Sequence, residues 1–142
     1  MTEAAIVIQK LTTLREHLDR VRRRRPANVE ALRADVDIQD ALALSLLVAI
    51  QEAVDIAFHI AADEGWGVPS SYGEGFEILS RHGVIDAGLA RELAAASALR
   101  NRIARGYASV DVERLWAEIP TGVSALDRYA AAIARFVPAS GS

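Results

Sequence analysis

The sequence contains no cysteine among its 142 residues. Disulfides, thiolate zinc sites and cysteine nucleophiles are therefore excluded, and nothing favours an oxidising compartment. Histidine is scarce as well, because only His17, His59 and His82 are present, and no two have the spacing of a local metal site. We therefore expect no bound metal.

Proline and glycine are rare in the first 64 residues, where alanine and leucine are abundant. No segment alternates apolar and polar residues for long enough to predict a strand. The pattern predicts an all-α fold. The length suits one domain with its own core, and no second core is expected.

Long apolar runs and a strong charge of one sign are also missing. The longest uncharged apolar stretch, 41–50, is too short to span a bilayer, and Met1–Lys10 lacks the basic start and apolar run of a signal peptide. We expect a soluble cytoplasmic protein. The net charge of -3 argues against a protein that coats nucleic acid in general, so any RNA contact has to be local.

Apolar spacing predicts two helices in the first half of the chain. One seam from Val7 to Val21 indicates a helix of about six turns, which Pro26 stops. It ends in the arginine run 22–25, which is either a solvated helix end, the interpretation we favour, or a binding site for RNA phosphate. Asn28 can cap a short turn, and a second helix is predicted from Asp35 or Asp37 to Glu64.

The middle of this second helix, 41–50, is apolar nearly all round, which predicts the central element of a bundle and a dimer surface as well. Ser45, Glu52, Asp55 and His59 share one stripe of it. This stripe either faces solvent or meets the arginines of a later motif.

Three further helices are predicted from their caps. Ser71, Asp86 and Asp111 begin segments that end at Gly83, at Gly106 and near Val137. The apolar phase of the last segment continues through position 120, so we predict one kinked helix instead of two. Residues 139–142 are expected to form a loose tail.

Polar chemistry is concentrated in residues 99–107, which contain Arg100, Asn101, Arg102, Arg105 and Tyr107. One interpretation is structural, with the arginines as last-turn cations and Tyr107 as a packing residue. The other is a functional motif.

The order Arg100-Asn101, three residues, position 105, one residue, Tyr107 resembles the Arg-Asn-x-x-x-His-x-Tyr signature of the HepT toxins, a branch of the HEPN superfamily. Segments 38–41 and 49–60 look like the long second helix of that family, and 68–79 looks like its next loop and helix. The resemblance implies one HEPN-type up-and-down bundle of about five helices over residues 1–138.

The resemblance also implies a metal-independent ribonuclease, with Arg100, Asn101 and position 105 as its catalytic residues and Arg100, Arg102 and Arg105 as its RNA-binding residues. This sequence departs from the pattern at position 105, where Arg105 replaces the histidine of the family. An arginine stays protonated and cannot act as a general base. We therefore expect either an inactivated variant or a natural member that binds without cutting.

The partners implied by the resemblance are RNA, a second copy of the chain, and a minimal nucleotidyltransferase antitoxin of the MntA type. The antitoxin would transfer AMP from ATP to Tyr107, so ATP and magnesium would belong to the partner and this chain would hold no cofactor. The alternative is a non-catalytic helical module that holds a nucleotide or a partner protein with Arg100, Arg102 and Arg105.

Overall fold

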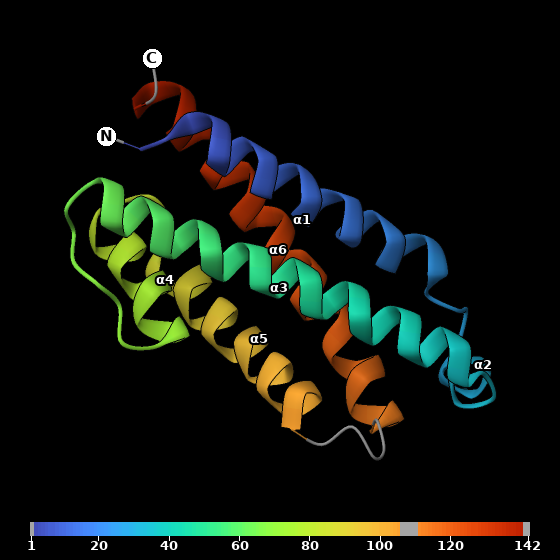
Figure 1. Ribbon diagram of the computed structural model, residues 1–142. Helices are drawn as coiled ribbons and strands as arrows, with labels where there is room; N and C mark the ends of the chain where they lie inside the picture. The colour runs from blue at the N-terminus through green and yellow to red at the C-terminus, as the bar shows by residue number, and fades with distance from the viewer. Residues whose placement is uncertain (1, 106–110, 141–142) are drawn as a thin grey trace.

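One long helix, α3 (Val36–Asp63), lies at the centre of the molecule, and every other helix packs against it. The structure is a computed structural model that describes residues 2–105 and 111–140, with side chains at 2–102 and 111–137. Within these ranges there are six helices and no strand (Figure 1). The other five are α1 (Ala4–Arg24), α2 (Val29–Arg33), α4 (Tyr72–Arg81), α5 (Ala87–Arg105) and α6 (Val112–Ser140).

The predicted all-α class is confirmed, and short polar side chains explain where the helices begin. Five of the six described helices start at a side chain that accepts a hydrogen bond from the backbone N–H three residues later, which satisfies a donor that the helix leaves free. These residues are Asn28, Asp35, Ser71, Asp86 and Asp111. The caps predicted from the sequence are thus confirmed. The short turn predicted after Asn28 is a helix in its own right, α2, which brings the number of described helices to six.

The arginine run at the end of α1 is mostly bound to the protein itself. Arg22 pairs with Asp127 of α6 at 3.2 Å, and Arg25 lies over the ring of Trp116 at 4.2 Å. Arg23 pairs with an aspartate four residues earlier on its own helix. Two of the four arginines therefore link α1 to α6 and a third pairs within α1, which supports the structural interpretation of the run.

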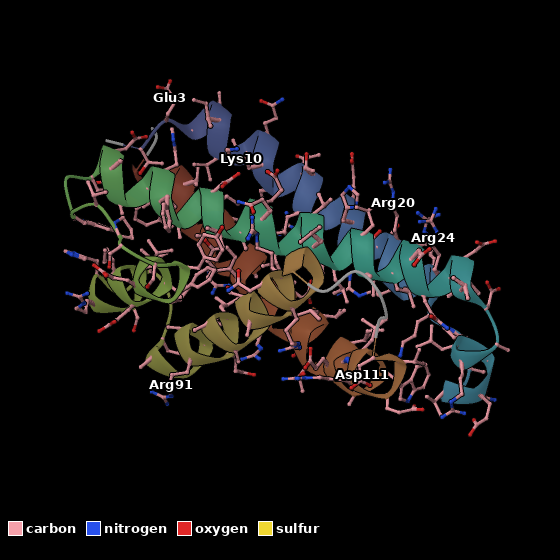
Figure 2. The ribbon with its side chains drawn as sticks, turned by 60° about the horizontal axis from the view of Figure 1, so that its bottom comes forward. Glu3, Lys10, Arg20, Arg24, Arg91 and Asp111 are labelled. Atoms are coloured by element: carbon pink, nitrogen blue, oxygen red, sulfur yellow. The ribbon has the colours of Figure 1, made fainter. Side chains whose placement is uncertain are left out.

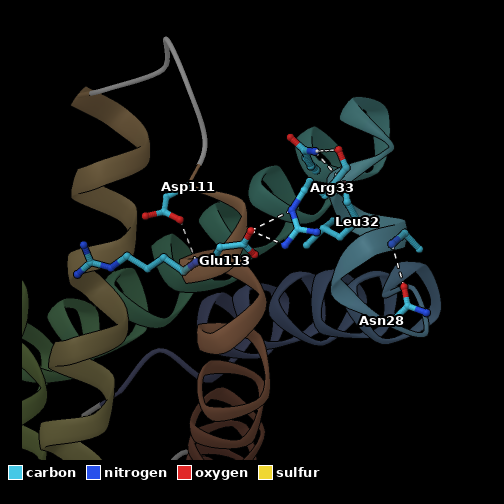
Figure 3. A network of polar contacts seen from close by, with 8 residues as sticks. Asn28, Leu32, Arg33, Asp111 and Glu113 are labelled. Carbon is cyan, nitrogen blue, oxygen red and sulfur yellow. Dashed lines mark hydrogen bonds and ion pairs between the residues drawn. The ribbon is translucent and has the colours of Figure 1, made fainter.

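The short helix α2 packs against the beginnings of α3 and α6 at one end of the bundle. Its Arg33 side chain donates to Glu113 at the start of α6, with an Nε to Oε1 distance of 3.0 Å (Figure 3). Gln39 of α3 donates to the backbone carbonyl of Leu32 at 2.9 Å. These contacts fix the beginning of α6 against α3.

The last helix is continuous through Pro120, as predicted. Leu115, Ile119, Leu126 and Ile133 are buried on its inner face. Tyr129 is buried as well, so the buried face of α6 is wider than the predicted apolar seam. The face is wide because α1, α3 and α5 all contact α6.

By length and composition alone, α3 is apolar enough to cross a membrane. More than half of its most apolar window, 56%, is buried inside the molecule. Since five helices pack on it, its apolar character is explained by a central place in a bundle.

Part of α3 remains uncovered on its outer side. Val36 is 63% exposed and Leu44 is 55% exposed, while Leu47 is half-buried. We call Val36, Leu44 and Leu47 the outer apolar face of α3.

A close approach between α4 and α3 positions the aromatic side chain at the start of α4. A Cβ atom on Gly75 would lie 2.7 Å from Cε1 of Phe58, so only glycine fits here without a shift. The Phe58 ring meets Tyr72 edge to face, with centroids 6.2 Å apart. Tyr72 is thereby placed beside the last turns of α5, where the predicted motif lies.

Candidate functional site

Arg100 of α5 is held by neutral groups. Its Nε donates to Oε1 of Gln51 on α3 at 2.8 Å, and its Nη1 donates to Oδ1 of Asn101 at 3.4 Å. Its guanidinium carbon lies 5.1 Å from the centre of the Tyr72 ring. Among the described residues no carboxylate pairs with Arg100, so its positive charge is available to an anion.

Behind Arg100, a polar chain crosses α3 to α1. Nε2 of Gln51 donates to Oδ1 of Asp55 at 2.9 Å, and Oδ2 of Asp55 lies 3.6 Å from Nζ of Lys10. Figure 2 shows Lys10 on α1, the helix beside α3. Of the predicted stripe on α3, Asp55 is linked to Arg100 only through the Gln51 amide, and Gln51 is not a member of that stripe.

Glu52 adds a second, partly buried carboxyl group to this region. Burial raises the pKa of Glu52 above its ordinary value, Asp55 raises that pKa further, and Lys10 lowers it.

Arg102 differs from Arg100 because a carboxylate neutralises it. One Nη2 atom of Arg102 donates to both oxygens of Glu118 on α6, each at 2.5 Å. Glu118 also accepts from Arg114 at 2.9 Å. The charge of Arg102 is therefore already paired within the protein, which makes Arg102 a weaker phosphate ligand than Arg100.

The remaining motif residues are only partly described. Asn101 is exposed and accepts from Arg100. The Arg105 side chain and Tyr107 lie outside the part of the molecule that the structure describes. Their roles stay predictions.

Within the described residues, no histidine contacts Arg100. Nε2 of His59 lies 3.0 Å from Oδ2 of Asp63, near the end of α3, and His82 stacks on Trp66 with ring centroids 4.0 Å apart. His17 lies on α1, where burial lowers its pKa. No imidazole in these ranges is placed to exchange a proton beside Arg100.

A small groove of about 250 Å³ lies next to the motif, between α3, α5 and α6. Its walls include Leu46, Leu99 and Leu126. The two carboxylates that line it, Glu92 and Glu118, are both ion-paired with arginines. The groove offers apolar contact and no free acid or base.

Across residues 2–105 and 111–140, no group of three or more histidine, aspartate or glutamate side chains is close enough together to hold a metal ion.

Two side chains of the site, Gln51 and Tyr72, were not singled out by the sequence. Gln51 precedes Glu52, which was, but its contact with Arg100 joins residues 49 positions apart. Tyr72 lies inside a segment that resembles the HepT toxins, yet nothing in its spacing indicates a contact with α5.

The model of the family described as "Ribonuclease HepT-like" matches residues 14–133, which is most of the chain. The chain belongs to this HepT-like family. A curated relative, the mRNA nuclease HepT of Shewanella oneidensis, is 25% identical over 108 residues, which are 76% of this chain and 80% of that protein.

Solved structures show the same HepT-like fold. A tri-AMPylated HEPN toxin of Shewanella oneidensis, in complex with an MNT antitoxin, superposes with a TM-score of 0.84 at 21% identity, over 95% of this chain and 99% of that one. The cytosolic protein YutE of Bacillus subtilis, of unknown function, gives a TM-score of 0.81 at 17% identity, over 96% of this chain and 91% of that one.

Proposed function

We propose that this chain is the toxin of a type VII, HepT/MntA-type toxin–antitoxin pair, built on a metal-independent ribonuclease that cleaves RNA. The observation that carries the proposal is Arg100, whose charge meets an amide and an aromatic ring in place of a carboxylate. An arginine in this state is suited to a phosphate, which its planar donors bind in pairs.

In this proposal Arg100 binds the scissile phosphate and Asn101 orients it. The RNA 2′-hydroxyl loses its proton, its oxygen forms a bond to phosphorus, and the bond from phosphorus to the 5′-oxygen breaks as that oxygen gains a proton. Arg100 offsets the charge that develops on phosphorus. Arg102 and Arg105 contribute further contacts to the RNA.

Position 105 is where the proton transfer fails. A histidine there would exchange protons near neutral pH, whereas Arg105 keeps its proton. General acid–base help is worth about two to four orders of magnitude in rate. We therefore expect this chain to bind RNA and to cut it slowly or not at all.

The test restores the histidine. We expect Arg105→His to raise the rate of RNA cleavage about 10²- to 10⁴-fold in the presence of a chelator, and to inhibit growth of a host that expresses it. The measurement is single-turnover cleavage of labelled RNA. The control is Arg105→His combined with Arg100→Gln, which should be inactive. Equal cleavage by Arg105→His and the unchanged chain would contradict the proposal.

The same Arg105→His measurement tests the alternative function, a non-catalytic module that holds a nucleotide or a partner protein. The observation that favours this alternative is Arg105 itself, because arginines without a base can bind phosphate but not move a proton. Tight RNA or nucleotide binding without cleavage in either form would support it.

The proposed partner is an MntA-type nucleotidyltransferase that transfers AMP from ATP to Tyr107. The AMPylated state of the HEPN toxin of Shewanella oneidensis in its complex supports this proposal. An AMP group would bring a phosphate beside Arg100 and Arg102 and so compete with RNA.

Modification is tested by incubation with the antitoxin, ATP and magnesium, followed by peptide mass mapping. We expect AMP on Tyr107 and none in Tyr107→Phe. The reaction is repeated in the Arg105→His form, because position 105 is two residues away. An unmodified Tyr107 in both forms, with an antitoxin that is active on another HepT toxin, would reject the site.

We further propose that the protein is a cytoplasmic homodimer whose two motifs face each other. The outer apolar face of α3, with Leu44 55% exposed, supports a second copy as the covering partner. A cytoplasmic location agrees with the structural relative YutE, which is described as cytosolic.

A further inference from the structure

We infer that Gln51 is a positioning residue that fixes the Arg100 guanidinium while leaving its charge free for RNA phosphate. That the ligand of Arg100 is RNA rests on the proposed function. The role of Gln51 rests on the contacts between α1, α3 and α5.

The orientation of the Gln51 amide is determined from both sides. Its Nε2 donates to Asp55, an acceptor, and its Oε1 accepts from Arg100, a donor. A flipped amide would place its NH₂ group against the Nε–H of Arg100 and its oxygen against the carboxylate. Only one orientation of the Gln51 amide satisfies both Asp55 and Arg100. The Arg100 guanidinium therefore donates to an acceptor, Oε1 of Gln51, whose position is fixed.

The hydrogen bonds that position Arg100 use few of its N–H donors. An arginine has five N–H donors, and the described contacts use one on Nε and one on Nη1. The remaining donors, both on Nη2 and the second on Nη1, are sufficient for a two-point contact with a phosphate.

Arg102 shows how a carboxylate partner pairs with an arginine of the motif. It lies two residues further along α5 and is bound by both oxygens of Glu118. Near Arg100, the Asp55 carboxylate does not contact the guanidinium directly, because the Gln51 amide lies between them. Asp55 is itself paired with Lys10. Gln51 therefore lies between the Arg100 cation and the Asp55 carboxylate.

The decisive variant is Gln51→Glu, which keeps the shape of the side chain and adds the charge that the amide avoids. The new carboxylate pairs with Arg100, so we expect the affinity for a short, fluorescein-labelled single-stranded RNA to fall about ten- to a hundredfold. Fluorescence anisotropy measures the affinity. Gln9→Glu, the same change at an exposed position of α1, is the matched control and should bind as the unchanged chain does.

A role through Arg100 has a signature that a general loss of structure does not produce. Gln51→Glu should lower the salt dependence of binding by about 0.7 for the one phosphate contact it removes. Added to Arg100→Gln, it should cause no further loss, because the contact is already gone. Additive losses in the double variant, or a Gln51→Glu affinity equal to that of Gln9→Glu, would overturn the inference.

The hold on Arg100 is also measured without RNA. In a ¹H–¹⁵N spectrum, the Nε–H of Arg100 should exchange slowly with water in the unchanged chain and fast in Gln51→Ala. Equal exchange in both overturns the positioning role. If the unchanged chain and Arg100→Gln bind RNA equally poorly, the proposed function fails, while slow exchange that depends on Gln51 still supports the hold.

Discussion

Tyr129 of α6 is a fully buried residue that is independent of the candidate site. Its hydroxyl donates to the backbone carbonyl of Ala53 on α3 at 2.9 Å, and its ring meets Phe76 at an interplanar angle of 89°. Burial raises the pKa of the phenol well above its ordinary value of 10.0. The folded state therefore keeps this proton at a pH where the unfolded chain loses it.

This phenol gives a prediction with a definite sign. Its contribution to stability is complete below pH 10 and is lost as the pH rises above it, because the unfolded state then binds fewer protons. Tyr129→Phe should lower the free energy of unfolding by about 0.5–1.5 kcal/mol at neutral pH. It should also make the stability fall less steeply above pH 10. Urea unfolding over a pH series measures both, and equal alkaline slopes would contradict the assignment.

What the sequence predicts at this scale depends on the distance between partners. The motif around Arg100 is local, so its residues are visible in one short segment. Its contact with Gln51 depends on how α3 and α5 pack, and the apolar spacing of either helix does not determine the register between them. The same reason hides Tyr129, whose burial requires helices on several sides of α6.

Among the elements, α4 depends most on a single small residue. The Cβ atom that Gly75 lacks would lie 2.7 Å from the Phe58 ring, whereas one on Gly73 would be 3.5 Å from the nearest atom, Cβ of Ala94. Gly75→Ala should lower the free energy of unfolding by about 1–3 kcal/mol through overpacking. Gly73→Ala, on the same helix, should raise it by about 0.5–1 kcal/mol through helix propensity.

Chemical unfolding followed by circular dichroism compares the two variants. Since α4 also presents Tyr72 to Arg100, Gly75→Ala should weaken RNA binding as well. Equal stability of the two variants would show that the approach of α4 to α3 is looser than described.

Helix boundaries were the most predictable part of the fold, because capping side chains act within one turn. Asn28, Asp35, Asp86 and Asp111 mark starts that the structure confirms. At the start of α4 a second side chain joins the cap. Ser71 caps the helix, but Glu74 reaches one residue further back and accepts from the Ser70 backbone N–H and hydroxyl.

For the whole molecule, the prediction is a dimer at micromolar concentration, detected by sedimentation. Leu44→Glu should shift the protein towards monomer, because it puts a charge on the outer apolar face of α3. Val68→Glu, at a loop residue that is 89% exposed, is the control and should leave the dimer intact. A monomeric unchanged chain would argue strongly against the proposed dimer in which the two motifs face each other.

The long last helix carries the chain back to where it began. The start of α1 and the end of α6 lie at the same end of the bundle, while α5 ends far from both (Figure 1). Since 29 residues of helix span about 43 Å and Arg102 meets α6 near its beginning, at Glu118, a tag or surface anchor attached at the end of α6 stays remote from the motif. Immobilised protein should therefore present its motif to solution, which suits binding measurements on a sensor surface.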